Sequence, residues 1–314
     1  MSLHHNILRT LLKCPTSLAD LQAQTQVSLP TIRRAVQELT DSRWIRVVGQ
    51  AEANGGRPAM LYGRDDSKYV VIGLHLELPG IRLVFSDLRL KILDQVELFN
   101  GIVPSLSESI TAVAAYINNF KNAHPKRSII GVGIASPGFI DPKSGDIITI
   151  VRVPTWANFP FCRRLQAAVG VPVEIANDVD CMAFAEFENS SDPLEKNLAY
   201  VGFDEGVKVS LFLNGELYKG ALGNAGLISR HLLNVRDGSD LKELTGLLSY
   251  IGVNQSFEKR VMAVAPEARK EYETILGEEN LRERFNLIVS NAYGEMHICQ
   301  ETVEDLIEVL SAAI

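Results

Sequence analysis

The chain has 314 residues, of which 46% are hydrophobic and 22% charged, a composition typical of a globular protein rather than a disordered or fibrous one. No run approaches the roughly 18 apolar residues that cross a bilayer, and "MSLHHNILRTLLK" lacks the features of a signal peptide. We therefore expect a soluble, cytoplasmic protein with no membrane partner. The four scattered cysteines form no Cys-x-x-Cys pair, which argues against a disulfide framework or a zinc ribbon.

Charge is distributed unevenly along the chain. Residues 1–68 carry nine Lys/Arg and six Asp/Glu, a net of +3, whereas residues 69–314 carry 22 against 32, a net of −10. A basic head on an acidic body is typical of a nucleic-acid-binding module joined to another domain. We therefore predict two domains, a DNA-binding domain over residues 1–68 and a second domain over residues 69–314.

The start of the chain predicts three helices. Apolar spacing in "ILRTLL" indicates a first helix that ends near Cys14, and "TSLADLQAQTQ" indicates a second with Thr16 or Ser17 as its N-cap. The third, "LPTIRRAVQELTDS", is expected to be capped by Ser28 and to tolerate Pro30 in its first turn. The outer face of this third helix carries the side chains that we expect to contact DNA: Ser28, Thr31, Arg33, Arg34 and Gln37.

Two predicted strands follow the third helix. "WIRVVGQ" and "AMLYGRD" flank the loop "AEANGGRP", and together with the helices they predict a winged helix-turn-helix. Arginines and short polar residues at the start of the third helix suit a helix that enters the major groove by its N-terminal end. The alternative is a three-helix unit that only contacts protein. Arg57, in the loop, either belongs to a plain Gly-Pro turn or enters a narrow minor groove.

From residue 69 the pattern changes to strands that alternate with helices. The hairpin "YVVIGLHLELPGIRLVFSDL" precedes a helix of period 3.6 at residues 105–124, the buried strand "SIIGVGIASPGFID" and further helix–strand pairs. This alternation predicts an α/β domain with helices on the faces of its sheets. The polar strand ends Ser136–Gly138 and Asn177–Asp178 lie where α/β folds place ligands.

Several segments taken together resemble the ROK family, which groups repressors, open reading frames and kinases by a shared sugar-kinase fold. The resemblance covers residues 4–235 and rests on the order of the winged head with "GGRP", "VIGLHLELPGIRLVFSDL", "GVGIASPGFIDPKSGDI", "WANFPFCRRLQAAVGVPVEIANDVDCMAFAE" and "LFLNGELYKGALGNAGLI". It implies an α/β protein with an N-terminal winged helix-turn-helix followed by an actin-like ATPase (ribonuclease H-like) domain of two lobes. It also implies a sugar site between those lobes, double-stranded operator DNA as a partner, and a homodimer or higher homo-oligomer.

The resemblance also implies that the phosphate-binding loops of the family kinases are lost. Their first loop reads Asp-x-Gly-Gly-Thr, and the corresponding positions here are His75, Glu77, Leu78 and Pro79. Glu77 adds negative charge where a phosphate would lie, and Pro79 removes a backbone N–H donor. The second loop, "FDEGVKVS", places Asp204 and Glu205 against phosphate. We therefore expect no ATP binding, no catalysis and no cofactor.

The family's sugar site is matched only in part. The matched positions, where we expect a ligand, are Ser136, Gly138, Asn158, Asn177 and Asp178. Asp178 corresponds to the family's general base, which is vestigial if the kinase is dead. After "GNAG" the family reads Glu-Ile-Gly-His, whereas this chain has Leu227 for the glutamate and Arg230 for the histidine. Arg230 favours an anionic ligand such as a sugar phosphate. The family's cysteine-rich zinc segment has no counterpart, so we expect no metal.

Some features keep two interpretations. Asp178 either contacts a ligand or caps the helix that begins "VDCMAFAE". His231 is interpreted as a surface or capping residue, with a ligand role as the alternative. Residues 236–314 are rich in helical patterns and show no counterpart of the family's late strand, so we expect a reduced, helical C-terminal part. The last amphipathic stretch suits either a dimer surface or an ordinary packing face.

These features favour a transcriptional regulator. A winged helix would bind the operators of carbohydrate-related genes, and a catalytically dead sugar-kinase-like domain would sense a sugar or sugar phosphate. Two alternatives stay open: a residual sugar kinase, and a DNA-binding protein whose body binds no small molecule. The loop "HLELPG" argues against the kinase, whereas Leu227 and Arg230, which replace two residues of the family's sugar site, keep open a body that binds no ligand.

Overall fold

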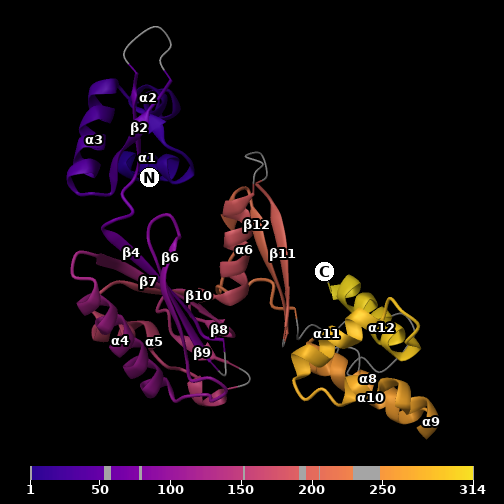
Figure 1. Ribbon diagram of the computed structural model, residues 1–314. Helices are drawn as coiled ribbons and strands as arrows, with labels where there is room; N and C mark the ends of the chain where they lie inside the picture. The colour runs from indigo at the N-terminus through magenta and orange to yellow at the C-terminus, as the bar shows by residue number, and fades with distance from the viewer. Residues whose placement is uncertain are drawn as a thin grey trace. The chain divides into compact units, whose positions relative to one another are not determined.

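The computed structural model describes residues 2–52, 58–77, 80–150, 153–190, 196–204, 206–228 and 248–313 (Figure 1). The chain divides into two compact units, Met1–Asn177 and Asp178–Ile314. Of the residues named individually in the sequence analysis, six lie outside the described ranges: Arg57, Leu78, Pro79, Glu205, Arg230 and His231. No helix within the described ranges is long and apolar enough to cross a membrane.

The first unit begins with residues 3–64, which we call the head. Its elements are α1 (Leu3–Lys13), β1 (Thr16–Ser17), α2 (Leu18–Thr25), α3 (Leu29–Asp41), β2 (Ile45–Gln50) and β3 (Met60–Arg64). The strands form one antiparallel sheet in the order β1-β3-β2. The sequence predicts the helices and the two longer strands but not β1, because two residues carry no periodic signal. Apolar side chains from the three helices and β2 form a single buried cluster: Ile7, Leu11, Leu21, Ile32, Ala35, Val36, Leu39 and Ile45.

The helix caps of the head follow the sequence with one correction. Ser17 rather than Thr16 is the N-cap of α2, and its Oγ accepts the backbone N–H of Asp20 at 3.2 Å. Ser28 occupies the N-cap position of α3, but the expectation that its side chain caps the helix is wrong. Its hydroxyl makes no capping hydrogen bond and lies 2.9 Å from that of Thr31. One fewer cap is needed here because Pro30, in the first turn, has no N–H to satisfy.

The remainder of the first unit is built on a five-stranded sheet, which we call the first sheet. Its strands are β4 (Tyr69–His75), β5 (Ile81–Ser86), β6 (Ile92–Leu98), β7 (Ser128–Ser136) and β10 (Val173–Asn177), in the order β10-β7-β4-β5-β6. The first three form an antiparallel meander, and β7 and β10 run parallel to β4. The sequence reasoning missed β6, since "ILDQVEL" mixes charged and apolar residues and is only partly buried.

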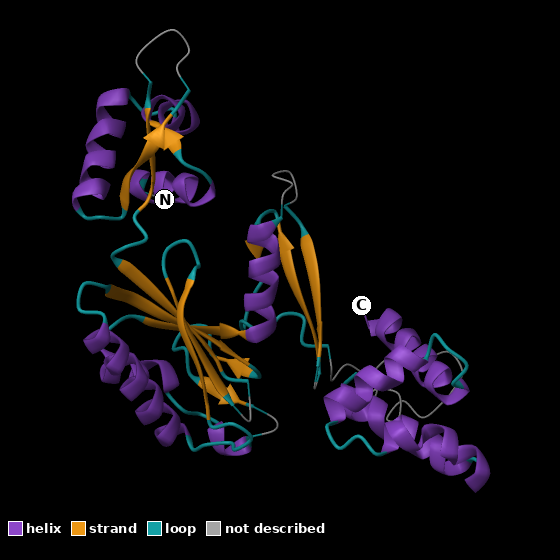
Figure 2. Ribbon diagram, in the orientation of Figure 1, coloured by secondary structure: helices purple, strands orange, loops and turns teal. Residues whose placement is uncertain are grey.

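Helices α4 (Leu106–Ala123) and α5 (Phe161–Val169) cover one face of the first sheet (Figure 2). A reciprocal capping box fixes the start of α4: the Ser105 Oγ accepts the Glu108 N–H, and the Glu108 carboxylate accepts the Ser105 N–H. Leu74 in β4 and Ile117 in α4 are almost fully buried in the continuous core between sheet and helices. Burying one such side chain contributes about 1.5–3 kcal/mol, so this core dominates the stability of the unit.

A small hairpin lies between β7 and α5. It consists of β8 (Phe139–Ile140) and β9 (Ile147–Thr149) and is followed by the 3-10 turn η1 (Pro154–Trp156). Trp156 is buried, and its indole N–H donates to the Pro104 carbonyl at 3.0 Å. The hairpin and its loop are thereby anchored next to the start of α4.

The second unit opens with α6 (Asp178–Asn189) and a three-stranded antiparallel sheet, which we call the second sheet. Its strands, β11 (Leu198–Phe203), β12 (Val207–Leu213) and β13 (Glu216–Leu217), are ordered β11-β12-β13. Helix α6 packs on one face, where the Phe187 ring stacks on that of Phe212 with centroids 4.3 Å apart. A Cβ added at Gly202 would lie 2.7 Å from a Val179 methyl, which explains the glycine at this close approach.

The end of the second unit is helical, as the sequence predicts. It contains α8 (Tyr250–Ala263), α9 (Pro266–Arg269), η2 (Lys270–Tyr272), α10 (Glu273–Leu276), α11 (Leu281–Asn291) and α12 (His297–Ala313). The final amphipathic stretch, interpreted above as a dimer surface or a packing face, packs within its own unit. In α12, Cys299, Leu306 and Val309 are buried in two apolar clusters.

Candidate DNA-binding face and ligand site

Helix α3 presents the predicted DNA-contacting side chains on one exposed face. Arg33, Arg34 and Gln37 are all exposed, while the opposite face is buried in the head. Gln37 donates to Asp41 at 2.7 Å, and Arg34 lies 3.9 Å from Glu38. Within the described ranges no ion pair is formed by Arg33, so its guanidinium is available for an outside acceptor such as a phosphate or a guanine edge.

The strand ends expected to hold a ligand lie side by side at one edge of the first sheet. Ser136 and Asn177 are register partners at the carboxyl ends of β7 and β10. Ser136 is fully buried, and its hydroxyl donates to the Pro137 carbonyl at 3.0 Å. The Asn177 side-chain amide donates to the Gly138 carbonyl at 3.3 Å. Both polar side chains therefore hold the loop after β7 in place, in addition to any contact with a ligand.

Gly138 and Asn158 owe their identity to backbone geometry. Gly138 has φ of 84°, and a Cβ there would lie 2.3 Å from the Thr149 carbonyl oxygen, so only glycine fits. Asn158 also has positive φ, 55°, and its N–H donates to the Ile148 carbonyl at 3.2 Å. The structure thus brings Ser136, Gly138 and Asn177 together directly and attaches Asn158 to the same β8–β9 hairpin.

Asp178 begins α6 and belongs to the second unit. One carboxylate oxygen accepts the N–H of Val179 at 2.8 Å. A capping side chain usually accepts the N–H of a residue two or three positions further on. This contact with the next residue therefore does not decide whether Asp178 caps α6 or contacts a ligand.

Two residues beyond Asp178 lies a buried ion pair that the sequence reasoning missed. The Lys208 ammonium is 2.6 Å from the Asp180 carboxylate, with 4% and 12% of the two side chains exposed, and the Ser210 hydroxyl donates to the same carboxylate at 2.5 Å. Burial lowers the pKa of Lys208, although Asp180 opposes that shift. Burial also raises the pKa of the neighbouring Cys181 thiol to about 11, with Asp180 adding to it. A lysine inside the apolar strand "VKVSLFL" was the available signal.

In the described parts of the two segments that correspond to the kinases' phosphate-binding loops, the carboxylates are paired with arginines. Glu77 accepts from the Arg82 guanidinium at 3.0 Å, and Asp204 from the Arg282 guanidinium at 2.5 Å. A nucleotide phosphate that approached either loop would meet a carboxylate, and the arginine beside it is already paired with that carboxylate. Within the described ranges no group of three or more His, Cys, Asp or Glu residues is placed to hold a metal ion.

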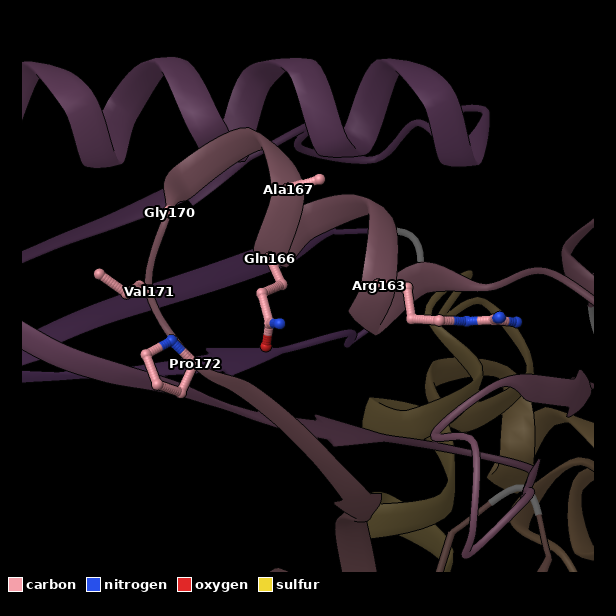
Figure 3. A pocket seen from close by; sticks show the side chains of 6 residues that line it. All are labelled: Arg163, Gln166, Ala167, Gly170, Val171 and Pro172. Carbon is pink, nitrogen blue, oxygen red and sulfur yellow. The ribbon is translucent and has the colours of Figure 1, made fainter.

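One cavity in the described part of the chain does not involve the predicted ligand residues. It has a volume of about 530 Å³ and lies where α5 ends and β10 begins (Figure 3). Its polar side chains are engaged: Arg163 pairs with Asp146 at 2.9 Å, and Gln166 accepts the Val173 N–H at 3.1 Å. The lining residues are Arg163, Gln166, Ala167, Gly170, Val171 and Pro172.

The first sheet with its helices, and the second sheet on α6, define a protein of the actin-like sugar-kinase fold. The model of the ROK family matches residues 76–239, just over half of the chain, and the chain belongs to this family. The resemblance inferred from the sequence is therefore confirmed.

Similar proteins include regulators and kinases. The chain is 28% identical over 225 residues to a xylose repressor of Bacillus subtilis, covering 70% of this chain and 57% of the repressor. It is 23% identical over 254 residues to the DNA-binding transcriptional dual regulator NagC of Escherichia coli, covering 79% and 61%. The chain thus spans about three fifths of the length of these curated relatives.

Solved structures agree on the fold. A ROK family transcriptional regulator, a homologue of the E. coli MLC protein, has a TM-score of 0.78 at 19% identity, covering 99% of this chain and 79% of that one. A ROK family glucokinase from Streptomyces griseus, solved with glucose and AMPPNP, has a TM-score of 0.57 at 18% identity, with 76% of each chain covered. At such identities the likeness concerns the fold.

Proposed function

We propose that this protein is a sequence-specific, DNA-binding transcriptional regulator whose body is a sugar-kinase-like sensor without kinase activity. Residues 1–68 would form a winged helix-turn-helix domain and residues 69–314 the sensor and dimerisation domain. The observation that carries the proposal is the two-faced α3: Ile32 and Val36 are buried in the head, whereas Arg33 is exposed on the opposite side. A xylose repressor and a DNA-binding transcriptional dual regulator among the similar proteins support it.

The order of elements in the head supports a specific mode of DNA binding. Helices α2 and α3 would form the helix-turn-helix, and β2 and β3 would form the wing. The N-terminal half of α3 would enter the major groove, where Arg33 and Gln37 reach base edges. Arg57, between the two wing strands in sequence, would enter the flanking minor groove. Phosphate contacts should make binding fall steeply with salt.

The paired carboxylates at Glu77 and Asp204 support the loss of kinase chemistry. We expect purified protein to show no sugar-dependent ATP turnover above a blank. The alternative of a residual kinase is favoured by Asp178, which keeps the position of the general base, and by kinases among the proteins of similar fold. Turnover that disappears in Asp178→Asn would establish that alternative.

The body's ligand is proposed to be a carbohydrate or a carbohydrate phosphate. Similar proteins are named as repressors for xylose and N-acetylglucosamine, and Arg230 favours an anionic group. A thermal-shift screen of neutral sugars and their phosphates tests this, because a ligand that binds the native state raises the melting temperature. Equal shifts for both forms would remove the preference for anions. No shift with any of them would favour a body that binds no small molecule, as the internal hydrogen bonds of Ser136 and Asn177 also do.

Selection of bound sequences from a random DNA pool tests the regulator assignment. Wild type should enrich one motif. Arg33→Ala should weaken binding by about 1–3 kcal/mol and blur the motif, as expected for a lost base contact. Arg57→Ala should chiefly relax a flanking preference for A·T pairs, since a narrow minor groove is read by shape.

The matched control is Lys13→Ala, which removes one exposed positive charge of the head outside α3. It should lower affinity slightly and leave the motif unchanged. If wild type enriches no motif, or Arg33→Ala and Arg57→Ala both return it unchanged, the head is not a sequence reader and the regulator assignment is wrong.

A further inference from the structure

We propose that the junction between α3 and β4 holds the head in one fixed orientation on the first sheet, so that the spacing of DNA half-sites is a property of the body and not of a flexible linker. The proposal rests on the DNA-binding function proposed above. Its basis is a set of hydrogen bonds, ion pairs and ring contacts that join the head to the segments around Tyr69 and Leu88, and the connecting residue Asp66 to Arg127.

The chain between head and sheet is short and internally bonded. Only Asp65, Asp66, Ser67 and Lys68 separate the end of β3 from the start of β4. Asp65 is 5% exposed, and its carboxylate accepts the Ser67 N–H at 3.0 Å and the Ser67 hydroxyl at 2.6 Å. A flexible linker would instead be a solvated run of small or polar residues without fixed contacts.

The C-terminal end of α3 is bound directly to the start of β4. The carbonyl of Ser42, the C-cap residue of α3, accepts the Tyr69 hydroxyl at 2.7 Å and the Lys68 ammonium at 3.1 Å. The Trp44 and Tyr69 rings stack with centroids 4.2 Å apart. The helix proposed to read DNA is therefore fixed to the first strand of the body.

Arg43 joins the helix end to the connecting chain. Its φ of 64° lies in the left-handed region, which a non-glycine residue adopts only where its surroundings hold it. Its guanidinium donates to the Asp65 carboxylate at 3.2 Å and to the Ser67 hydroxyl at 2.6 Å. The turn after α3 and the chain before β4 thus share one hydrogen-bonded cluster.

Further contacts come from two other segments of the body. Arg64, at the end of β3, donates to the Leu88 carbonyl at 2.6 Å, and Arg89 lies 2.9 Å from the Asp66 carboxylate. Arg127, before β7, donates to the Asp66 carbonyl at 3.1 Å. Attachments to three separate segments restrain rotation as well as translation, which one attachment could not do.

A fixed orientation has a consequence for DNA recognition. If two copies associate through their bodies, each head sits at a set distance and angle from its partner. Half-sites must then recur at one spacing, because a recognition helix reaches the major groove from the same side only at whole helical turns. Freely tethered heads would accept several spacings.

The rigidity is tested by distance measurements between spin labels on the full-length chain. The exposed native Cys14 carries one label on the head, and Asn118→Cys on the exposed side of α4 carries the other. Cys162 and Cys299 are buried and should react slowly near pH 8, because burial raises the pKa of both thiols to about 11, and the partly buried Cys181 is replaced by Cys181→Ser. Dilution with unlabelled protein removes distances between copies. Wild type should give one narrow distance distribution.

The junction variant is Arg43→Ala with Tyr69→Ala, which removes the Asp65 and Ser42 contacts and the ring stack together. It should broaden the distance distribution while circular dichroism and thermal unfolding confirm that it folds. Tyr69→Phe, which keeps the ring, should broaden it less. The control Arg163→Ala removes a comparable exposed ion pair far from the junction in sequence and should change nothing. A broad wild-type distribution, or a narrow one in the junction variant, would overturn the proposal.

The DNA consequence is read from the same random-pool selection. Wild type should return paired half-sites at one spacing, and the junction variant should return the same half-site sequence with loss of the spacing preference. A single spacing kept by the junction variant, or several spacings in wild type, would overturn the inference while DNA binding stands. If wild type enriches no motif, the proposed function is wrong instead. The distances between the spin labels then test the fixed orientation of the head by themselves.

Discussion

The first and second sheets both contain a three-stranded antiparallel meander, but they differ in what pairs with its first strand. In the first sheet, β4 has β5 on one side and the parallel β7 on the other, so its backbone is bonded along both edges. In the second sheet, β11 is the counterpart of β4, and within the described ranges only β12 pairs with it. The burial patterns agree with this difference. In β4 every second residue is buried, whereas no residue of β11 is buried.

The difference shows that the two units are stabilised in different ways. Outside the head, the first unit has one continuous apolar core made by its sheet, α4 and α5. The described part of the second unit has two smaller apolar clusters, and a buried ion pair, Lys208 with Asp180, lies between α6 and its sheet. The stability of the first unit should therefore depend mainly on the volume of its buried apolar side chains. The stability of the second unit should depend mainly on the ion pair between Lys208 and Asp180.

The largest effect is expected from breaking that pair. Lys208→Met removes the cation beside the buried Asp180 carboxylate while the Ser210 hydroxyl still donates to it, and losing one member of a buried pair costs about 3–5 kcal/mol. Urea unfolding of the second unit should shift accordingly. Adding Asp180→Asn should recover much of the loss, because no uncompensated charge is then buried. A double variant as unstable as the single one would mean that shape, and not charge, decides this site.

Apolar volume should matter most in the first sheet. Leu74→Ala, in the central strand, removes a side chain that is 1% exposed and should cost about 2–5 kcal/mol. The matched change in the second sheet, Val201→Ala at 41% exposure, should stay within about 0.5 kcal/mol. Denaturant titrations of both variants measure this contrast. Equal costs would indicate that β11 is covered in solution.

Acid should weaken the first unit through Asp65. Burial pushes the pKa of Asp65 upward, but the hydrogen bonds from Ser67 and Arg43 outweigh it, so the pKa lies below its ordinary value of 3.8. A carboxyl group with a lowered folded pKa stabilises the fold above the unfolded pKa and loses that contribution as pH falls through the folded pKa. The urea concentration at the unfolding midpoint of wild type should therefore decrease as the pH is lowered below about 4. Asp65→Asn should show a smaller decrease over the same pH range.

The smallest effect concerns thiol reactivity and leaves stability unchanged. Near pH 8 a thiol reagent should modify Cys14 quickly, since it is exposed. Cys162 and Cys299 should react only on opening, because both are buried and burial raises their pKa to about 11. With its divided core, the second unit should open more often, so that Cys299 reacts before Cys162. Mass spectrometry of peptides over time measures the order, and the reverse order would contradict the comparison.

Much of the fold could be predicted from local pattern. The helices of the head, the hairpin β4–β5, α4 and α5 follow from apolar spacing and caps, because a helix or strand repeats its contacts every few residues along the chain. The same signal fails at β6, whose burial depends on α4 and β5, and at the break between α11 and α12, where one amphipathic stretch becomes two helices.

For the site, the sequence by itself determined which residue types stand at the strand ends and on the outer face of α3, and the tertiary structure decided what they contact. Ser136 and Asn177 are readable as polar strand ends, but only the register of β7 and β10 brings the Asn177 amide to the Gly138 carbonyl. Lys208 and Asp180 lie 28 residues apart in sequence, and Arg43 and Asp65 lie 22 apart. Such pairs leave no periodic trace in the sequence, because their partners meet only after the intervening elements have packed.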